Sequence, residues 1–256
     1  MKSNQTIKEI KAQLLQETDQ TSAFIKEIEK DTRSGVQNAI RQWRKKLDKQ
    51  AKLKTHFMEM QQFELQARNQ GYKFIAGIDE VGRGPLAGPV VAAAVILPEC
   101  FNLVEVNDSK QLSASKREEL FTQIKAQALA IGIGVVDEKV IDKINIYEAT
   151  KYAMMQAIEK LEQAPDCLLI DAMTLPCALP QEKIIKGDAK SISIACASII
   201  AKVTRDKMMV DYDHLYPGYC FAKNAGYGTK EHLAGIEKQG ICPIHRQSFA
   251  PIKNLI

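Results

Sequence analysis

The pattern of apolar and polar residues changes character close to residue 71. Before that point the chain contains no proline and one glycine, Gly35, and is rich in residues that favour helices. Apolar residues recur there at helical spacing, as in Ile7, Ile10, Leu14 and Leu15. We therefore expect residues 1–71 to form a helical extension, with a break near residues 31–35 and helices over 35–54 and 55–69.

From Tyr72 onward, apolar runs of strand length alternate with helical patterns, which indicates a mixed α/β domain over residues 72–256. The predicted strands cover residues 73–79, 90–97, 130–136 and 167–171. The predicted helices cover residues 115–129, 145–163, 191–211 and 229–238, and a capping-box pattern from Ser115 to Glu118 opens the first of them. In the 191–211 helix, the spacing places Ser191, Ser198, Lys202 and Arg205 on one polar face.

The composition is that of a soluble globular protein, with 45% hydrophobic and 26% charged residues. The most apolar stretch, residues 89–98, is far shorter than the roughly 20 residues that cross a bilayer, so we expect no membrane association. Six scattered cysteines without a Cys-x-x-Cys pair, and no signal peptide, indicate reduced thiols in the cytoplasm. The four histidines lack metal-ligand spacing, which argues against a zinc hydrolase.

Positive charge is concentrated near the N-terminus. Residues 1–70 hold 14 Lys and Arg against 9 Asp and Glu, a balance of 14 − 9 = +5, whereas the whole chain carries +4. Residues 41–54 alone contain seven basic residues and one acidic residue. Such a run either contacts a nucleic-acid backbone through counterion release or forms a solvated helix face, and the sequence leaves both interpretations open.

The most informative segment is residues 77–89, where Asp79 and Glu80 end an apolar run and a Gly82-Arg83-Gly84 turn follows. Buried carboxylates are costly unless they are paired or bind a metal. Glycines allow close approach of a ligand to the backbone, and a guanidinium suits phosphate. The segment therefore suggests a metal-dependent site for a phosphodiester, although a purely structural turn is an alternative.

Two further acidic residues follow apolar runs, Asp171 after residues 167–170 and Asp188 after residues 184–187. Ligand sites gather at strand ends in α/β sheets, so these carboxylates and the Asp79-Glu80 pair are expected to converge. Such an all-oxygen site suits Mg²⁺ or Mn²⁺, and two ions can flank a scissile phosphate. Taken singly, Asp188 could cap a helix and Asp171 a turn, and adjacent strand residues such as Asp79 and Glu80 point to opposite faces.

These segments together resemble the motifs of ribonuclease HII, the type 2 ribonuclease H family. The resemblance lies in residues 77–91, 107–113, 170–172, 186–191 with 197–206, 225–233 and 245–249. It extends from about residue 74 to residue 251 in chain order. Several ordered motifs are far more specific than any one of them.

The resemblance implies a ribonuclease H-like fold, with a central mixed five-stranded sheet flanked by helices. It implies an endonuclease, dependent on Mn²⁺ or Mg²⁺, that hydrolyses RNA in RNA–DNA hybrids. It also implies nicking of DNA duplexes on the 5′ side of embedded ribonucleotides, leaving 3′-hydroxyl and 5′-phosphate ends. We expect the protein to act as a monomer.

The resemblance also assigns roles residue by residue. Asp79, Glu80, Asp171 and Asp188 match the metal-binding catalytic acids. Gly82, Arg83 and Gly84 match the loop that recognises the ribonucleotide 2′-hydroxyl, and Tyr227 matches the tyrosine that stacks on the sugar after the ribose. Lys110, Lys190, Ser191 and Ser198 lie in the matching motifs and are expected to contact the substrate.

Two alternatives accompany this interpretation. Ribonuclease HIII shares the fold and the four acids, but it has threonine where Arg83 stands and a long β-rich platform in front. A non-catalytic nucleic-acid-binding protein on a decayed nuclease fold would be expected to have lost an acid, and all four are present. The role of the N-terminal extension does not follow from the resemblance.

Overall fold

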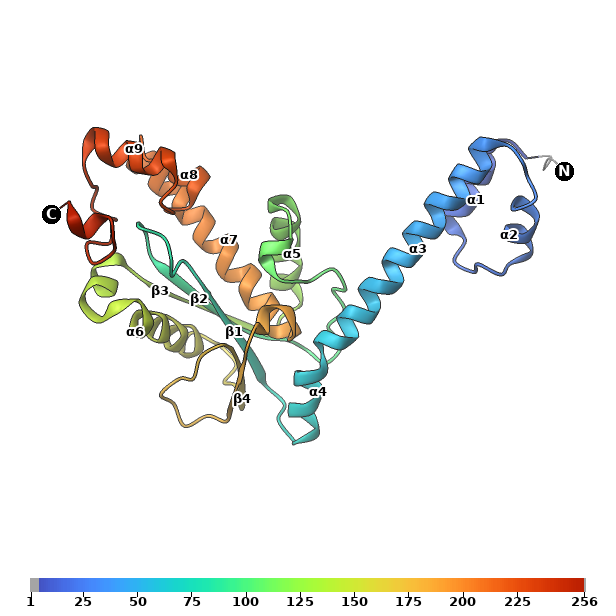
Figure 1. The fold of residues 1–256 in the computed structure, drawn as a ribbon. Coiled ribbons are helices and arrows are strands. Elements are labelled where there is room, and N and C mark those ends of the chain that lie inside the picture. Colours follow the sequence, from blue (N-terminus) through green and yellow to red (C-terminus); the bar gives the residue numbers. More distant parts are fainter. Residues whose placement is uncertain (1–4, 256) are drawn as a thin grey trace. The chain divides into compact units, whose positions relative to one another are not determined.

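The computed structural model describes residues 5–255, which form two compact units (Figure 1). The first unit extends to Met58 and the second begins at Glu59. The helices of the N-terminal region are α1 Ile7–Gln16, α2 Ala23–Ile28, α3 Ser34–Met60 and α4 Gln62–Asn69. The predicted helical extension is confirmed over residues 7–69, and so is its break near residue 31; residues 1–4 lie outside the described part of the chain. However, α3 continues to Met60, beyond the expected end at residue 54, so the next helix begins at Gln62 and not at residue 55.

The first unit has its own small core. Apolar side chains of α1, α2 and the start of α3 are buried together. This core consists of Ile10, Leu14, Ile25, Ile28, Val36, Ala39, Ile40 and Trp43. The capping box of Thr6 and Glu9 fixes the start of α1. Trp43 donates from its indole nitrogen to the carbonyl oxygen of Glu17 at 3.0 Å, which satisfies its buried polar atom.

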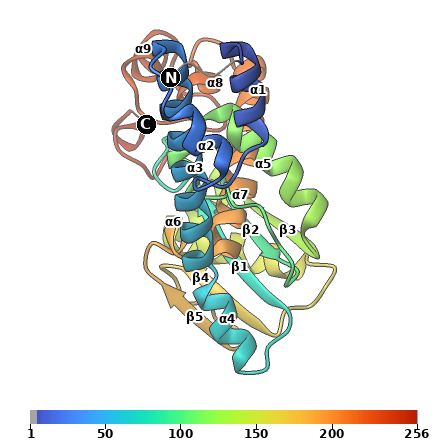
Figure 2. The ribbon, with the colours of Figure 1, turned by 90° about the vertical axis from the view of Figure 1, so that its right-hand side faces the viewer.

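The second unit is built on a mixed five-stranded sheet, as expected. The strands are β1 Ile75–Val81, β2 Val90–Ile96, β3 Ala130–Val136, β4 Cys167–Asp171 and β5 Gln181–Ile184, in the order β3-β2-β1-β4-β5. β1, β2 and β3 pair antiparallel, whereas β1–β4 and β4–β5 are parallel. β5 lies at one edge beside β4 (Figure 2) and was not among the strands predicted from the apolar pattern.

Long helices cover both faces of this sheet (Figure 1). The remaining helices are α5 Ala114–Gln127, α6 Glu138–Glu159, α7 Ile192–Leu215, α8 Phe221–Asn224 and α9 Lys230–Gln239. A β-carbon on Gly77 of β1 would lie 2.2 Å from the backbone of Ser193 in α7, and one on Gly134 of β3 would lie 1.8 Å from the carbonyl oxygen of Ala153 in α6. Glycine at these positions therefore allows the two helices to pack directly against the strands.

Three helix details differ from the predictions. Ser113, and not Ser115, caps α5 by accepting from the amide of Lys116. α6 begins at Glu138, capped by Asp137, and the predicted start at residue 145 is the start of its second half only. Asn145 interrupts that helix with a φ of 67°, and its side-chain oxygen accepts from the amide of Tyr147 at 2.9 Å, so it starts the second half of the helix.

The predicted polar face of α7 is also wrong in part. Ser191, Ser198 and Arg205 are all buried, and Lys202 is half-buried. α7 packs along β1 and β2, so most of its circumference is covered, and its polar groups find partners inside the protein. No helix in the described residues combines the length and apolar content needed to cross a membrane.

Candidate active site

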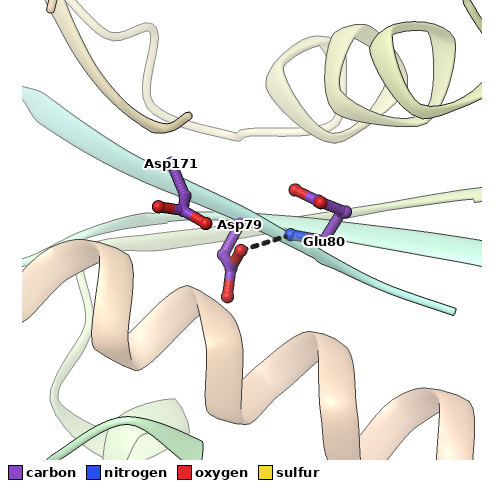
Figure 3. Close-up of side chains that lie close together, drawn as sticks. All are labelled: Asp79, Glu80 and Asp171. Atoms are coloured by element: carbon purple, nitrogen blue, oxygen red, sulfur yellow. Dashed lines mark hydrogen bonds between the residues drawn. The ribbon is translucent and has the colours of Figure 1, made fainter. Parts of the chain in front are cut away.

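Three acidic side chains meet where β1 and β4 end. Asp79 and Glu80 belong to β1, and Asp171 is the last residue of β4, which runs parallel to β1 with Ile78 opposite Ile170. Figure 3 shows Asp79 and Glu80 leaving β1 on opposite sides. One oxygen from each of the three carboxylates nevertheless lies within 4.8 Å of the other two, so the strand pleat does not separate them.

Burying three carboxylates this close together is electrostatically unfavourable. Asp79 is 3% exposed, and burial, followed by the charge of Glu80, raises its carboxyl pKa well above 3.8. Burial also raises the pKa values of Glu80 and Asp171. Oε2 of Glu80 is buried and accepts no hydrogen bond from the described residues.

A divalent cation would relieve this repulsion. Three carboxylates with a free buried oxygen form a hard, anionic donor set, and no histidine or cysteine of the described residues joins the cluster. Such oxygen ligands suit Mg²⁺ or Mn²⁺. The residues present therefore fit a metal of this class.

Asp188, the fourth predicted acid, is not part of this group of three and lies on a separate loop. It lies in the short 3₁₀ turn Gly187–Ala189, and its Oδ2 accepts from Nζ of Lys110 at 3.0 Å. It does not cap α7, because Ser191 holds that position. The amide of Gly187 donates to Oδ1 of Asp171 at 2.7 Å, so the loop carrying Asp188 is tied to the end of β4.

Ser198 and Lys110 each interact with one of the predicted acids, Ser198 with Asp79 and Lys110 with Asp188. The hydroxyl of Ser198 lies 2.8 Å from that of Ser109, and its hydrogen bond to Asp79 counteracts part of the burial effect on the pKa of that carboxyl. Lys110 is on the 3₁₀ turn Ser109–Gln111, which Asp108 caps. Both predicted substrate contacts thus lie beside the carboxylates.

Lys190 and Ser191 have different surroundings. Lys190 is exposed just before α7. Ser191 is fully buried, caps α7, and donates from its hydroxyl to Oε1 of Glu64 at 2.6 Å. In this structure its side chain therefore has an internal partner, and its contact with substrate stays a prediction.

The glycine loop, residues 82–89, follows directly after β1. Gly82 has a φ of 91°, which favours glycine, and a β-carbon there would lie 2.2 Å from Nε of Arg205. Arg83 pairs with Glu80 at 3.3 Å and is partly exposed. Tyr227 is 48% exposed, and its ring lies next to Gly84, 3.5 Å from where a β-carbon would be.

Sequence reasoning missed two kinds of residue around this site. Glu64 of α4 is buried against the start of α7, far away in sequence, and no local motif announces it. Arg246 was noted only as part of a C-terminal motif, yet it is fully buried beneath the glycine loop. Its position directly after His245 in that motif was the signal available.

Comparison with known proteins assigns the family. The family model described as Ribonuclease HII matches residues 76–252, and the model described as Ribonuclease HII N-terminal domain matches residues 6–68. The chain belongs to the ribonuclease HII family. The two matches divide the chain close to the predicted boundary at residue 71, whereas packing divides it at residue 58, because α4 joins the core of the second unit.

Relatives support this over nearly the full length. The chain is 59% identical to a ribonuclease HII of Enterococcus faecalis, covering 99% of this chain and 100% of the relative. It is 56% identical to a ribonuclease HII of Listeria innocua, covering 98% and 96%. As a member of this family, it is a hydrolytic endonuclease with ribonuclease H activity on RNA–DNA hybrids.

Solved structures agree on the fold of the second unit. The ribonuclease H2 of Pyrococcus horikoshii matches with a TM-score of 0.60 and 26% identity, over 71% of this chain and 96% of that one. A ribonuclease HIII named Bst-RNase HIII matches with a TM-score of 0.53 and 20% identity, over 71% of this chain and 68% of that one. The second likeness concerns the fold alone, and the family assignment sets aside the ribonuclease HIII alternative.

Proposed function

We propose that this ribonuclease HII is a metal-dependent endonuclease that also nicks DNA duplexes on the 5′ side of embedded ribonucleotides. The products carry 3′-hydroxyl and 5′-phosphate ends. The observation that carries the metal dependence is the cluster of Asp79, Glu80 and Asp171, with oxygens within 4.8 Å and one buried oxygen left free. The ion is Mg²⁺ or Mn²⁺, the class that such oxygen ligands prefer.

The four acids divide the work by position. Asp79, Glu80 and Asp171 would hold the ion, and Asp188, which is paired with Lys110, would add a fourth carboxylate from its loop. When bound, the ion supplies Lewis acidity and an activated water for attack on phosphorus. Lys110 lies beside the acids, where its ammonium group offers a positive charge to the substrate phosphate.

Substrate recognition is assigned to the glycine loop and Tyr227. The main chain of Gly82, Arg83 and Gly84 is assigned to the ribose 2′-hydroxyl, the group that distinguishes RNA from DNA; Gly84 is exposed, and Arg83 offers a fork to phosphate. Tyr227 lies next to Gly84 and is half exposed, so its ring is available to stack on the following sugar. The protein acts as a monomer in this proposal.

The proposal is tested with three substrates of equal length. These are a duplex with one ribonucleotide, an all-DNA duplex and a continuous RNA–DNA hybrid, each with Mg²⁺, Mn²⁺ or a chelator. We expect cleavage of the first and third, none of the second, and none with the chelator. Cleavage 3′ of the ribonucleotide, or full activity without metal, contradicts the proposal.

Tyr227→Ala separates the recognition role from the chemistry. Loss of stacking is worth about 1–3 kcal/mol, or roughly 5- to 150-fold. The loss falls harder on the single-ribonucleotide duplex than on the hybrid, where many registers are available. Tyr227→Phe keeps the ring and serves as the control, and equal loss on both substrates makes Tyr227 a structural residue.

A further inference from the structure

Two arginines lie fully buried beneath the substrate-facing loops. Arg205 comes from the middle of α7 and Arg246 from the C-terminal segment, and both have 0% exposure. Charged side chains are rarely buried unless they are paired with an opposite charge. All the hydrogen bonds described for these two guanidinium groups are accepted by main-chain carbonyl oxygens.

Arg205 joins two loops that are far apart in sequence. Its Nε donates to the carbonyl of Pro89 at 2.9 Å and its Nη2 to that of Ala87 at 3.1 Å, both in the segment that follows the acids. Its Nη1 donates to the carbonyl of Ala225 at 2.8 Å, two residues before Tyr227. One planar group therefore sets the spacing between these segments.

Arg246 holds the glycine loop itself. Its Nη2 donates to the carbonyl of Gly82 at 2.5 Å and its Nη1 to that of Arg83 at 2.9 Å. Its Nε donates to the carbonyl of Gly88 at 2.9 Å. Carbonyls that point inward to Arg246 cannot point outward, so this residue fixes the orientation of the peptide units that face the substrate.

The two loops also bond to each other. The amide of Leu86 donates to the carbonyl of Gly226 at 2.8 Å, and the amide of Arg246 donates to the carbonyl of Leu86 at 2.8 Å. We therefore expect substitution of either arginine to displace Gly84 and Tyr227 together. Burial lowers the pKa of Arg205 to about 10 and that of Arg246 to about 9, and the cost of burying both charges indicates that the hydrogen bonds matter.

We propose that Arg205 and Arg246 are positioning residues that hold the glycine loop and the Tyr227 segment, residues 224–228, at the spacing needed to recognise a single ribonucleotide in DNA. This rests on the proposed function, in which both segments contact the substrate. A long hybrid offers many registers, so it depends less on that spacing. The arginines act through the loops and touch no reacting atom.

The test uses Arg205→Lys and Arg246→Lys in the full-length chain. Lysine keeps the charge but loses the fork that reaches several carbonyls at once. We expect kcat/KM to fall at least tenfold on the single-ribonucleotide duplex and less than about threefold on the hybrid, because small misplacements at a site are costly. We also expect faster amide exchange in residues 82–89 and 224–228.

Ile236→Ala is the matched control, because it removes core packing from the same C-terminal cluster without touching these carbonyls. It should lower stability and leave the ratio of the two activities unchanged. If both lysine variants lose activity equally on both substrates, or change the ratio no more than Ile236→Ala, the inference is overturned.

A gentler variant covers the case in which the lysine variants do not fold. Asn224 is the first residue of the Tyr227 segment; its side-chain oxygen accepts from the amide of Gly226 at 2.8 Å, and its side-chain nitrogen donates to the carbonyl of Tyr219 at 2.7 Å. Asn224→Ala should shift the ratio in the same direction, and an unchanged ratio contradicts the inference. Failure of the proposed function is visible separately, since wild-type protein would then leave the single-ribonucleotide duplex uncut.

Discussion

The acid cluster and the two arginines beneath the glycine loop are both buried charged groups, but they differ in how far their hydrogen-bonding capacity is satisfied. Asp79, Glu80 and Asp171 face one another, and a buried oxygen of Glu80 accepts no hydrogen bond from the described residues. Arg205 and Arg246 direct every guanidinium nitrogen to a carbonyl oxygen. The acids with an unsatisfied oxygen indicate a site for a bound ion. The arginines, whose guanidinium nitrogens all have hydrogen-bond partners, instead hold the loops around that site in place.

The difference has a consequence for stability. The repelling carboxylates oppose folding until a cation arrives, because desolvation and like charge both penalise the ionised forms. The arginine bonds act in the opposite sense, because losing one would leave buried carbonyls unpaired. Active sites commonly sacrifice stability in this way for function.

Asp79→Asn should break the acid cluster most completely. Loss of a negative ligand costs several kcal/mol of transition-state stabilisation, so we expect cleavage to slow by roughly three orders of magnitude or more. Duplex binding should survive, since backbone phosphates supply most of the affinity. Near-normal turnover of Asp79→Asn with Mg²⁺ or Mn²⁺ would contradict the assignment of Asp79 as a metal-binding catalytic acid.

The same variant should be more stable than the wild type when both are metal-free. The folded-state pKa of Asp79 is raised, so the wild type loses stability as pH rises above the unfolded pKa near 3.8, and asparagine avoids that loss. The gain should be largest at neutral pH and vanish below about pH 4. Thermal unfolding with and without metal measures this, and Mn²⁺ should stabilise the wild type more than the variant.

Glu64 is a second buried acid, and it differs from the cluster in that one of its oxygens, Oε1, accepts several hydrogen bonds, although its Oε2 has no hydrogen-bond partner among the described residues. Its Oε1 accepts from the hydroxyls of Ser191 and Ser193, each at 2.6 Å, and from the amide of Ser193 at 3.0 Å. Glu64→Ala should destabilise the protein by on the order of 3 kcal/mol, because buried donors lose their acceptor. Glu64→Gln keeps an acceptor oxygen and should cost less in urea unfolding.

Truncation gives a second measurement of the same interaction. A chain starting at residue 59 keeps α4 and Glu64, and should fold and cleave, whereas a chain starting at residue 71 lacks both and should be much less stable. Equal stability of the two truncated chains contradicts the role given to Glu64. The comparison also decides where the catalytic unit begins.

Much of this architecture was predictable because strands and their ends leave strong patterns. The apolar runs located four strands, and carboxylates following two of those runs, Asp79 and Asp171, meet as expected. β5 was not predicted, because this edge strand consists mostly of polar residues, Gln181, Glu182 and Lys183, and so has no apolar pattern. Arg205 was expected on a polar face, since a sequence shows charge but not the carbonyls that a fold brings to it.

The buried histidines His232 and His245 offer a third case, in which titratable side chains are buried in their neutral form. The amide of Cys242 donates to Nδ1 of His245 at 2.8 Å, so the His245 proton is on Nε2, 3.0 Å from Nε2 of His232. His232 then donates from Nδ1 to the carbonyl of Tyr227 at 2.9 Å. Protonating either ring would set two N–H groups against each other.

This pair predicts an acid-sensitive stability. Burial lowers the pKa of His245 to about 4, from an ordinary 6.5, and also lowers that of His232. The stabilisation is therefore complete above about pH 6.5 and is lost as pH falls towards 4, on the order of 3 kcal/mol for His245. His245→Gln should flatten the dependence of unfolding free energy on pH across that window, whereas the exposed His214→Gln should not.

The smallest effect is expected where charge is never buried, in the basic run of α3. Lys45, Lys46 and Lys49 are exposed and have no described ion pair, whereas Arg44 pairs with Glu29. If the three lysines contact flanking phosphates, changing all of them to Gln should weaken duplex binding and lower the salt slope by roughly 0.9 per lost contact. Cleavage at saturating substrate should not change, because the acids lie in the second unit.

Lys8→Gln with Lys11→Gln is the matched control, since both lysines are exposed in α1 of the same unit but lie outside the run. We expect the control to leave the salt slope of binding unchanged and the triple variant to lower it. Equal slopes for the two variants would assign the run to a solvated helix face. The only charged groups left to contact the substrate would then be those proposed in the second unit, such as Arg83 and Lys110.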